Sequence, residues 1–144
     1  MADSRHPPAV TTTLEAWHRM IAAGDLGGLS ALLRPEATFR SPMAFKPYAS
    51  ANAVNLILTT VSGVFEDFVY HRELASNDGL SVVLEFSARV GDKQLKGIDL
   101  IRFDADGRIV DFEVMIRPLS GLQALGEQMG QRIGPLLAAF KAPG

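Results

Sequence analysis

The chain has 144 residues and a formal net charge of -2, from 14 basic and 16 acidic residues. Hydrophobic residues make up 47% and charged residues 21%, which is the composition of one globular domain rather than of a disordered chain. The basic residues are scattered and not interleaved with aromatic ones, so no nucleic-acid partner is expected. The chain contains no cysteine, which excludes disulfides, thiolate metal sites and cysteine nucleophiles.

Hydropathy gives no sign of export or of membrane insertion. The segment from Met1 to Pro8 is polar and lacks the apolar stretch of a signal peptide. No apolar run is long enough to span a bilayer. The sequence therefore predicts a cytoplasmic protein that does not enter a membrane.

The N-terminal part of the chain predicts a tail and then a helix. Residues 1–10 read as a flexible tail. Thr12 and Glu15 have the spacing of a capping box, which predicts that the first helix begins there. Trp17 lies on the apolar stripe of this helix, and Gly24 is expected to end it.

The next segment predicts a second helix, a strand and a loop. The leucines of residues 26–33 are spaced for one face of a short helix, which Asp25 would cap and Pro35 would end. Residues 37–41 predict a short strand. Residues 43–50 carry proline and aromatic residues without periodicity and predict a loop.

The rest of the chain predicts helix, four strands and helix. Residues 51–64 have apolar residues spaced for one helical face, and residues 119–140 predict a longer amphipathic helix. Alternating patterns bounded by Gly, Asn and Asp predict antiparallel strands at residues 68–74, 80–90, 94–103 and 108–117. With no internal repeat and no linker, residues 11–144 predict a single α+β domain with a curved, mixed or antiparallel sheet whose concave face is covered by helices.

Asp99 is the residue that fits its surroundings least well. It lies between Ile98 and Leu100 in a strand that should be buried, where a lone carboxylate is costly. One interpretation is a pocket acid whose pKa is raised by desolvation. The other is an outward-facing residue paired with an arginine such as Arg102 or Arg117.

A resemblance to a known family rests on three stretches, which read AWHRMIAAGDLGGLSALL, PEATFRSP and GIDLIRFDADGRIVDF. Together with the element order, they resemble the nuclear-transport-factor-2-like superfamily, in its SnoaL-like polyketide cyclase and ketosteroid isomerase group. The resemblance covers nearly the whole domain. It implies a cystatin-like cone, in which the curved sheet wraps around helices and encloses an internal pocket. Because enzymes and plain binders share this fold, the resemblance leaves the activity open.

The resemblance implies roles for three positions. Ketosteroid isomerases keep a protonated Asp in an apolar pocket, where it donates to the developing enolate oxygen, and Asp99 falls at that position. Trp17 stands where that family has a tyrosine donor. Ser41 stands where it has an aspartate base, and a serine cannot abstract a proton unaided. Ordinary ketosteroid isomerase activity is therefore not expected, whereas the polyketide cyclases of this fold are similar in using a single acid or base.

The turn at residues 104–107 decides which residue lies opposite Asp99. A type I turn with a bulge at Gly107 would place Asp99 opposite Glu113. The apolar alternate set should face the core, as the equivalent set does in the related isomerases. An inward Asp99 then requires one extra bulge, and we favour that arrangement. The apolar set consists of Phe112, Val114 and Ile116.

The expected function is binding of a small, largely apolar molecule, and the expected chemistry is cofactor-free acid/base catalysis on a carbonyl compound. This would be an isomerase, cyclase or dehydratase with Asp99 as its catalytic residue. Two alternatives stay open: a non-catalytic binding module, which the missing base favours, and a structural dimerisation domain with a filled core. His18 and His71 have no close spacing, so no metal site is expected. The expected ligand contacts are Trp17, Phe39, Ser41, Phe86, Phe112, Val114 and Ile116.

The other face of the sheet predicts a protein partner. Ile98 and Leu100 share the face opposite to Asp99, and Val83 on the neighbouring strand is apolar too. A sheet with large apolar residues on both faces should bury the second face. We therefore expect a homodimer packed through its sheets.

Overall fold

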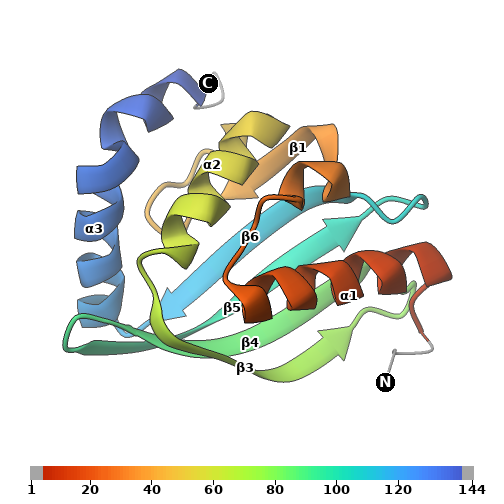
Figure 1. Cartoon of the computed structure of the whole chain (residues 1–144), viewed down its shortest axis with the longest axis horizontal. Helices are drawn as coiled ribbons and strands as arrows, with labels where there is room; N and C mark the ends of the chain where they lie inside the picture. The colour runs from red at the N-terminus through yellow and green to blue at the C-terminus, as the bar shows by residue number, and fades with distance from the viewer. Residues whose placement is uncertain (1–4, 141–144) are drawn as a thin grey trace.

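The computed structural model describes residues 5–140, and Figure 1 shows its helices packed against a single sheet. Two short 3-10 turns, η1 (Leu29–Leu32) and η2 (Ala138–Phe140), supplement the regular elements. In chain order, these elements are α1 (Pro8–Ala23), β1 (Leu33–Arg40), β2 (Tyr48–Ala49), α2 (Ala51–Ser62), β3 (Glu66–Ala75), β4 (Ser81–Val90), β5 (Lys93–Phe103), β6 (Ile109–Arg117) and α3 (Leu119–Leu137).

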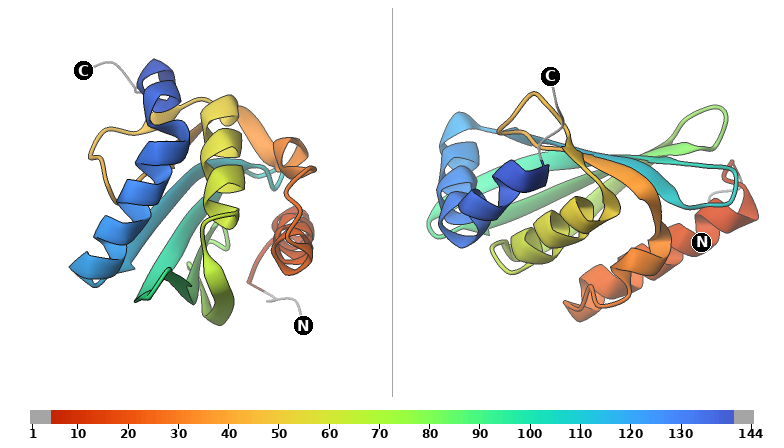
Figure 2. Two further views of the ribbon diagram at one scale, coloured as in Figure 1. Left: turned by 60° about the vertical axis from the view of Figure 1, so that its left-hand side comes forward. Right: turned by 90° about the horizontal axis from the view of Figure 1, so that it is seen from above.

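The sheet is mixed and open, with the strand order β2-β1-β6-β5-β4-β3. Strands β1 and β6 are parallel, and the other neighbours are antiparallel. The sheet curves, and the three helices lie on its concave side (Figure 2). This arrangement confirms the predicted α+β fold with a curved sheet around helices. Among the described residues, no helix is long and apolar enough to cross a bilayer.

Alternation along the central strands places one apolar set against the helices. In β4, Val82, Leu84 and Phe86 are buried. Val83 and Ser87 belong to the alternate set and are partly exposed. The same alternation in β5 puts Asp99 on the inward face. The core therefore forms between the concave face and the helices, and Asp99 projects into it.

The hairpin of β5 and β6 carries the extra bulge that an inward Asp99 requires. The pairing shifts directly after Arg102, so that Val110 is left as the additional residue. Asp99 consequently pairs with Val114, and Glu113 falls on the alternate, outward set. The favoured register is confirmed, and Asp99 has an apolar neighbour rather than a second carboxylate.

The beginning of α1 differs from the prediction. The helix begins at Pro8, and Val10 in its first turn is completely buried. The Thr12 hydroxyl donates to the Pro8 carbonyl at 3.0 Å and does not cap the helix. Proline is favoured at a first helical position, and burial of Val10 outweighs the capping-box signal. The predicted tail 1–10 is therefore wrong at residues 8–10, while its first four residues lie outside the described part.

The second predicted helix, at residues 26–33, is also wrong. Only the 3-10 turn η1 forms there, and Leu33 already begins β1, where it pairs with Ile109 of β6. Gly27 and Gly28 disfavour a helix at this point. The strand predicted at residues 37–41 is correspondingly longer, and Pro35 lies inside it rather than ending a helix.

Gly97 of β5 offers a test of how tightly the sheet packs. A Cβ added there would overlap the Met115 carbonyl oxygen and approach the Phe86 ring to 2.8 Å. We expect Gly97→Ala to lower the free energy of unfolding by about 1–3 kcal/mol, the usual cost of overpacking. Urea unfolding followed by circular dichroism would measure this.

Gly130 of α3 provides the matched control for this substitution. A Cβ at Gly130 would meet no atom within 4 Å, so Gly130→Ala should raise helix stability by up to about 1 kcal/mol. Equal effects of the two substitutions would contradict the packing described for β5.

Candidate functional site

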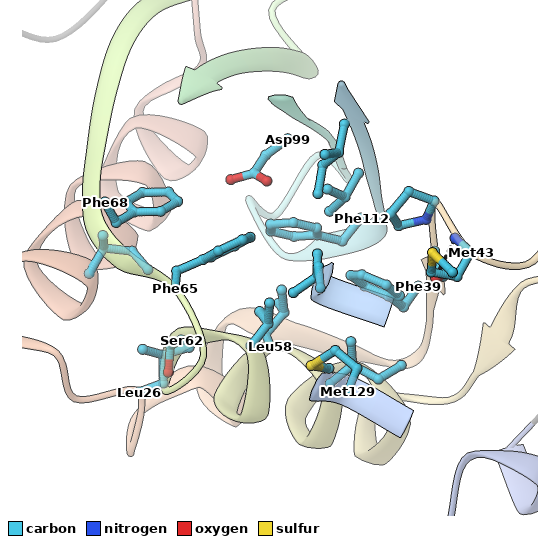
Figure 3. A pocket seen from close by; sticks show the side chains of 18 of the residues that line it. Leu26, Phe39, Met43, Leu58, Ser62, Phe65, Phe68, Asp99, Phe112 and Met129 are labelled. Carbon is cyan, nitrogen blue, oxygen red and sulfur yellow. Dashed lines mark hydrogen bonds between the residues drawn. The ribbon is translucent and has the colours of Figure 1, made fainter. Parts of the chain in front are cut away.

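A cavity of about 580 Å³ lies between the concave face of the sheet and the helices. This is within the range of pockets that hold small organic molecules. Figure 3 shows aromatic rings and methionine side chains around it, with the Asp99 carboxyl at one end. Its apolar walls include Phe39, Phe65, Phe68, Phe112, Val114 and Ile116.

Asp99 is the buried carboxyl of this cavity. Its side chain projects from the middle of β5, between Leu84 of β4 and Val114 of β6, and the residue is only 6% exposed. Burial raises the pKa of Asp99 to about 7, against an opposing hydrogen bond from Tyr70. A substantial share of Asp99 is therefore a neutral acid at physiological pH.

A chain of hydrogen bonds holds the Asp99 carboxyl from one side. The Tyr70 hydroxyl donates to Asp99 Oδ2 at 2.5 Å, and the Trp17 indole N–H donates to the Tyr70 oxygen at 2.9 Å. Desolvation, followed by the negative charge of Asp99, raises the pKa of Tyr70 well above its usual value, so Tyr70 remains a donor. Within residues 5–140, no hydrogen bond engages Asp99 Oδ1, which leaves this oxygen for a molecule in the cavity.

Trp17 lines the cavity but reaches Asp99 only through Tyr70. Its ring also packs edge-on against Phe112, with 5.4 Å between the ring centroids. Sequence reasoning missed Tyr70, because the facing of β3 depends on two register shifts in its pairing with β4. The available signal was the spacing of Phe68 and Tyr70, which are two positions apart in β3 and so place both rings on one face of the strand.

Ser41 lies where the resemblance implied a base, and its surroundings suit a structural role. It lines the cavity, and its hydroxyl oxygen accepts a hydrogen bond from the Met43 backbone N–H at 3.0 Å. No hydrogen bond to a histidine or a carboxylate is formed by Ser41 within the described chain. Ser41 thus stabilises the loop after β1, as a cap for a backbone group.

Phe86 is the predicted wall residue that the structure places elsewhere. It does not line the cavity but lies fully buried behind Phe65 and Phe68, with ring centroids 5.6 and 5.0 Å away. Phe86 is therefore not part of the cavity wall, because Phe65 and Phe68 cover this part of β4. The other six predicted contacts line the cavity: Trp17, Phe39, Ser41, Phe112, Val114 and Ile116.

His71 on β3 and His18 on α1 have different surroundings. His71 hydrogen-bonds Ser87 at 2.8 Å and points away from the cavity, because Ser87 belongs to the outward set of β4. His18 lines the cavity, and its Nε2 lies 3.0 Å from Glu73 Oε1. The part of the chain that the structure describes contains no cluster of three or more His, Asp or Glu residues suited to a metal ion.

The raised pKa of Asp99 makes stability depend on pH in a defined direction. Unfolded Asp99 titrates near pH 3.9, so between about pH 4 and pH 7 the folded state holds one more proton than the unfolded chain. The free energy of unfolding should therefore fall as pH rises through this window, by about 4 kcal/mol at 1.4 kcal/mol per unit. Asp99→Asn should remove this fall.

Urea unfolding at about pH 5 and about pH 8 would measure the difference. Asp92→Asn, in the exposed turn between β4 and β5, is the matched control and should keep the wild-type dependence. An Asp99→Asn variant with the wild-type dependence would show that Asp99 is already ionised.

Comparison with known proteins places this geometry in a family. The model of the SnoaL-like domain family matches residues 14–112. A steroid delta-isomerase from Pseudomonas aeruginosa is 66% identical, with a TM-score of 0.89 over 92% of this chain and 97% of that one. An uncharacterized bacterial protein with a cystatin-like fold from Silicibacter pomeroyi is 33% identical, with a TM-score of 0.79 over 85% of each chain. No curated protein matches.

More distant structures share the fold alone. The epoxide hydrolase/cyclase-like enzyme SalBIII, described for pyran ring formation in the polyether salinomycin, is 15% identical. Its TM-score is 0.61, over 75% of this chain and 90% of that one. The family match and the two relatives above 30% identity show that this protein belongs to the SnoaL-like domain family.

Proposed function

We propose that the protein is a cofactor-free acid/base enzyme of the isomerase type that acts on a small hydrophobic carbonyl compound. The observation that carries this proposal is a buried carboxyl, Asp99, which lines an apolar cavity and of whose two oxygens only Oδ2 is hydrogen-bonded within the described chain. The 66% identity to a steroid delta-isomerase supports the same reaction class.

Asp99 would act on the carbonyl oxygen. A neutral carboxyl at Oδ1 donates a hydrogen bond or a proton to that oxygen as negative charge develops on it. The Tyr70 hydroxyl then stabilises the charge that passes to the Asp99 carboxylate, because it already donates to Oδ2. Trp17 holds Tyr70 in the orientation that this requires. These donors are in place before the reaction, so little reorganisation is needed.

The cavity indicates the class of substrate. Its walls are apolar, and Asp99 with Tyr70 forms a polar group at one end, so a ketone with a hydrocarbon or aromatic body fits best. An unsaturated ketone meets this requirement, because its carbonyl would reach Asp99 while its body contacts the phenylalanines. A Δ5-3-ketosteroid is the natural first probe, given the named activity of the relative.

A non-catalytic binding protein is the second candidate. Ser41 favours it, because its hydroxyl is engaged by the Met43 backbone and supplies no carboxylate at the position where the related isomerases have a base. Under this alternative, the same cavity would hold an apolar ligand with Asp99 as its hydrogen-bond donor, and no turnover would follow.

Asp99→Asn tests the proposed function. Isomerisation of a Δ5-3-ketosteroid, followed by the absorbance of the conjugated product, should fall by about 10²–10⁴-fold, the usual contribution of a general acid. Wild-type turnover should also fall as pH rises above about 7, because the neutral form of Asp99 is lost. Tyr70→Phe should move this fall to higher pH, since the Tyr70 hydrogen bond lowers the pKa of Asp99.

Asp92→Asn is the control, because it removes a carboxylate that lies outside the cavity. This variant should turn over the ketosteroid at the wild-type rate. If the ketosteroid raises the melting temperature but neither the wild type nor any variant turns it over, the result would favour the binding protein. Full turnover in Asp99→Asn would refute the role of Asp99.

The outer face of the sheet supports a second proposal, a homodimer packed through its sheets. Leu74 is 50% and Met115 is 45% exposed on this face, beside the partly buried Ile98 and Leu100. Burial of such a patch against a second copy would stabilise both faces of the sheet.

Light scattering at micromolar concentration would test the dimer. We expect a mass of two chains for the wild type and of one chain for Met115→Glu, because a charge would be buried without a partner. Phe45→Glu is the control, since Phe45 is 99% exposed in the loop before β2 and away from the proposed contact. A monomeric wild type would contradict the proposal.

A further inference from the structure

The proposed reaction needs a second proton-transfer group. Moving a double bond next to a ketone requires removal of a proton from carbon as well as stabilisation of the carbonyl oxygen. Asp99 can serve the oxygen, and Ser41 offers no base. The inference that follows rests on the proposed function and names the group that would act on carbon.

His18 is the candidate among the ionisable side chains of the cavity wall. Within the described chain, these side chains are His18, Tyr48, Tyr70 and Asp99. A phenol is a poor base at neutral pH, whereas an imidazole suits proton transfer there. His18 thus has the side chain chemistry that the cavity otherwise lacks.

The geometry gives His18 a defined tautomer. Glu73 Oε1 lies 3.0 Å from Nε2, and a carboxylate accepts, so Nε2 of a neutral His18 carries the hydrogen. The lone pair then resides on Nδ1. No hydrogen bond to Nδ1 occurs within residues 5–140. A carboxylate that orients a histidine and stabilises its protonated form is a recurring arrangement in general-base catalysis.

A register shift in β3 makes this arrangement possible. Tyr70 and Glu73 are three residues apart, so simple alternation would place them on opposite faces of the sheet. The pairing with β4 shifts between them, and both side chains reach consecutive residues of α1. Tyr70 hydrogen-bonds Trp17, and Glu73 pairs with His18.

Tyr70 also fixes the spacing of the acid and the base. The His18 ring packs edge-on against the Tyr70 ring, with 5.4 Å between centroids, while Asp99 accepts from the hydroxyl at the other end of the same side chain. The two groups therefore lie at the two ends of one tyrosine side chain, and both line the same cavity. We propose that His18, oriented by Glu73, is the catalytic base that shuttles the proton between carbons.

The step balances without a further reactant. His18 Nδ1 takes a proton from the carbon next to the carbonyl; the C–H electron pair forms a C=C bond, and the C=O π pair moves to oxygen. Asp99 gives its proton to that oxygen and becomes a carboxylate. His18 then returns its proton to the more distant carbon, the double bonds shift back, and the enol O–H returns its proton to Asp99. The product is an isomer of the ketone.

Deuterium exchange into the ketone tests the role of His18 more directly than turnover. In deuterated buffer, proton NMR of a Δ5-3-ketosteroid reports proton abstraction at carbon. We expect His18→Gln to slow the exchange by about 10²–10⁴-fold with little change in KM, because a base acts in the transition state. Glu73→Gln should slow exchange less, since Glu73 is a positioning residue that leaves the imidazole in place.

Two controls separate catalysis from structure. His71→Gln replaces a histidine on the outward face of the sheet and should exchange at the wild-type rate. His18 and Glu73 are partly exposed, so the hydrogen bond between them contributes little to folding, and the variants should keep the wild-type melting temperature. In His18→Ala, added imidazole should restore part of the exchange rate, which a structural role would not allow.

The outcomes distinguish this inference from the proposed function. If His18→Gln exchanges deuterium at the wild-type rate while Asp99→Asn loses exchange, the role of His18 would be overturned and that of Asp99 would stand. Failure of imidazole to restore exchange in a folded His18→Ala would likewise overturn it. The absence of both isomerisation and exchange in the wild type itself would overturn both.

Discussion

The arrangement of the cavity depends on one contact, the hydrogen bond from Tyr70 to a carboxyl that has lost its water. Burial alone would favour a neutral Asp99, and the Tyr70 hydroxyl opposes this by stabilising the charged form. The balance leaves the pKa of Asp99 about 7, where both forms are populated. In the proposed reaction, Asp99 must give up and regain a proton, and this balance favours both steps more than a solvated or an unpartnered carboxyl would.

Irregular pairing in two parts of the sheet supports this contact. The bulge after Arg102 sets Val114 beside the inward Asp99, and the two shifts in β3 let Tyr70 and Glu73 both face α1. In ideal pairing, strict alternation would place Tyr70 and Glu73 on opposite faces of the sheet. Regular alternation thus places Asp99 and the apolar walls, while irregular pairing brings Tyr70 and Glu73 to the same face.

Sequence patterns predict the elements that depend on local residue spacing, but not the features that depend on how one strand pairs with another. Alternation and turn residues predict the meander of strands, and the hairpin motif predicts an inward Asp99. The helix that the leucine spacing predicts at residues 26–33 does not form, because Gly27 and Gly28 disfavour it and Leu33 pairs with Ile109 of β6 instead. Hydrophobic periodicity contains no information about such strand pairing. Tyr70 was missed because its facing depends on register shifts in β3, which only the pairing with β4 defines.

Helix α3 contributes to the size of the cavity but not to its ionisable side chains. The acid, its donors and the His18–Glu73 pair lie within residues 14–112, the part that the family model matches. Helix α3 follows that part and contributes Gly126 and Gly130 to the wall. A side chain at Gly126 would overlap Met43, whereas one at Gly130 would enter open space. Substitutions at these positions of α3 would therefore change the size of the cavity without altering Asp99, Tyr70 or His18.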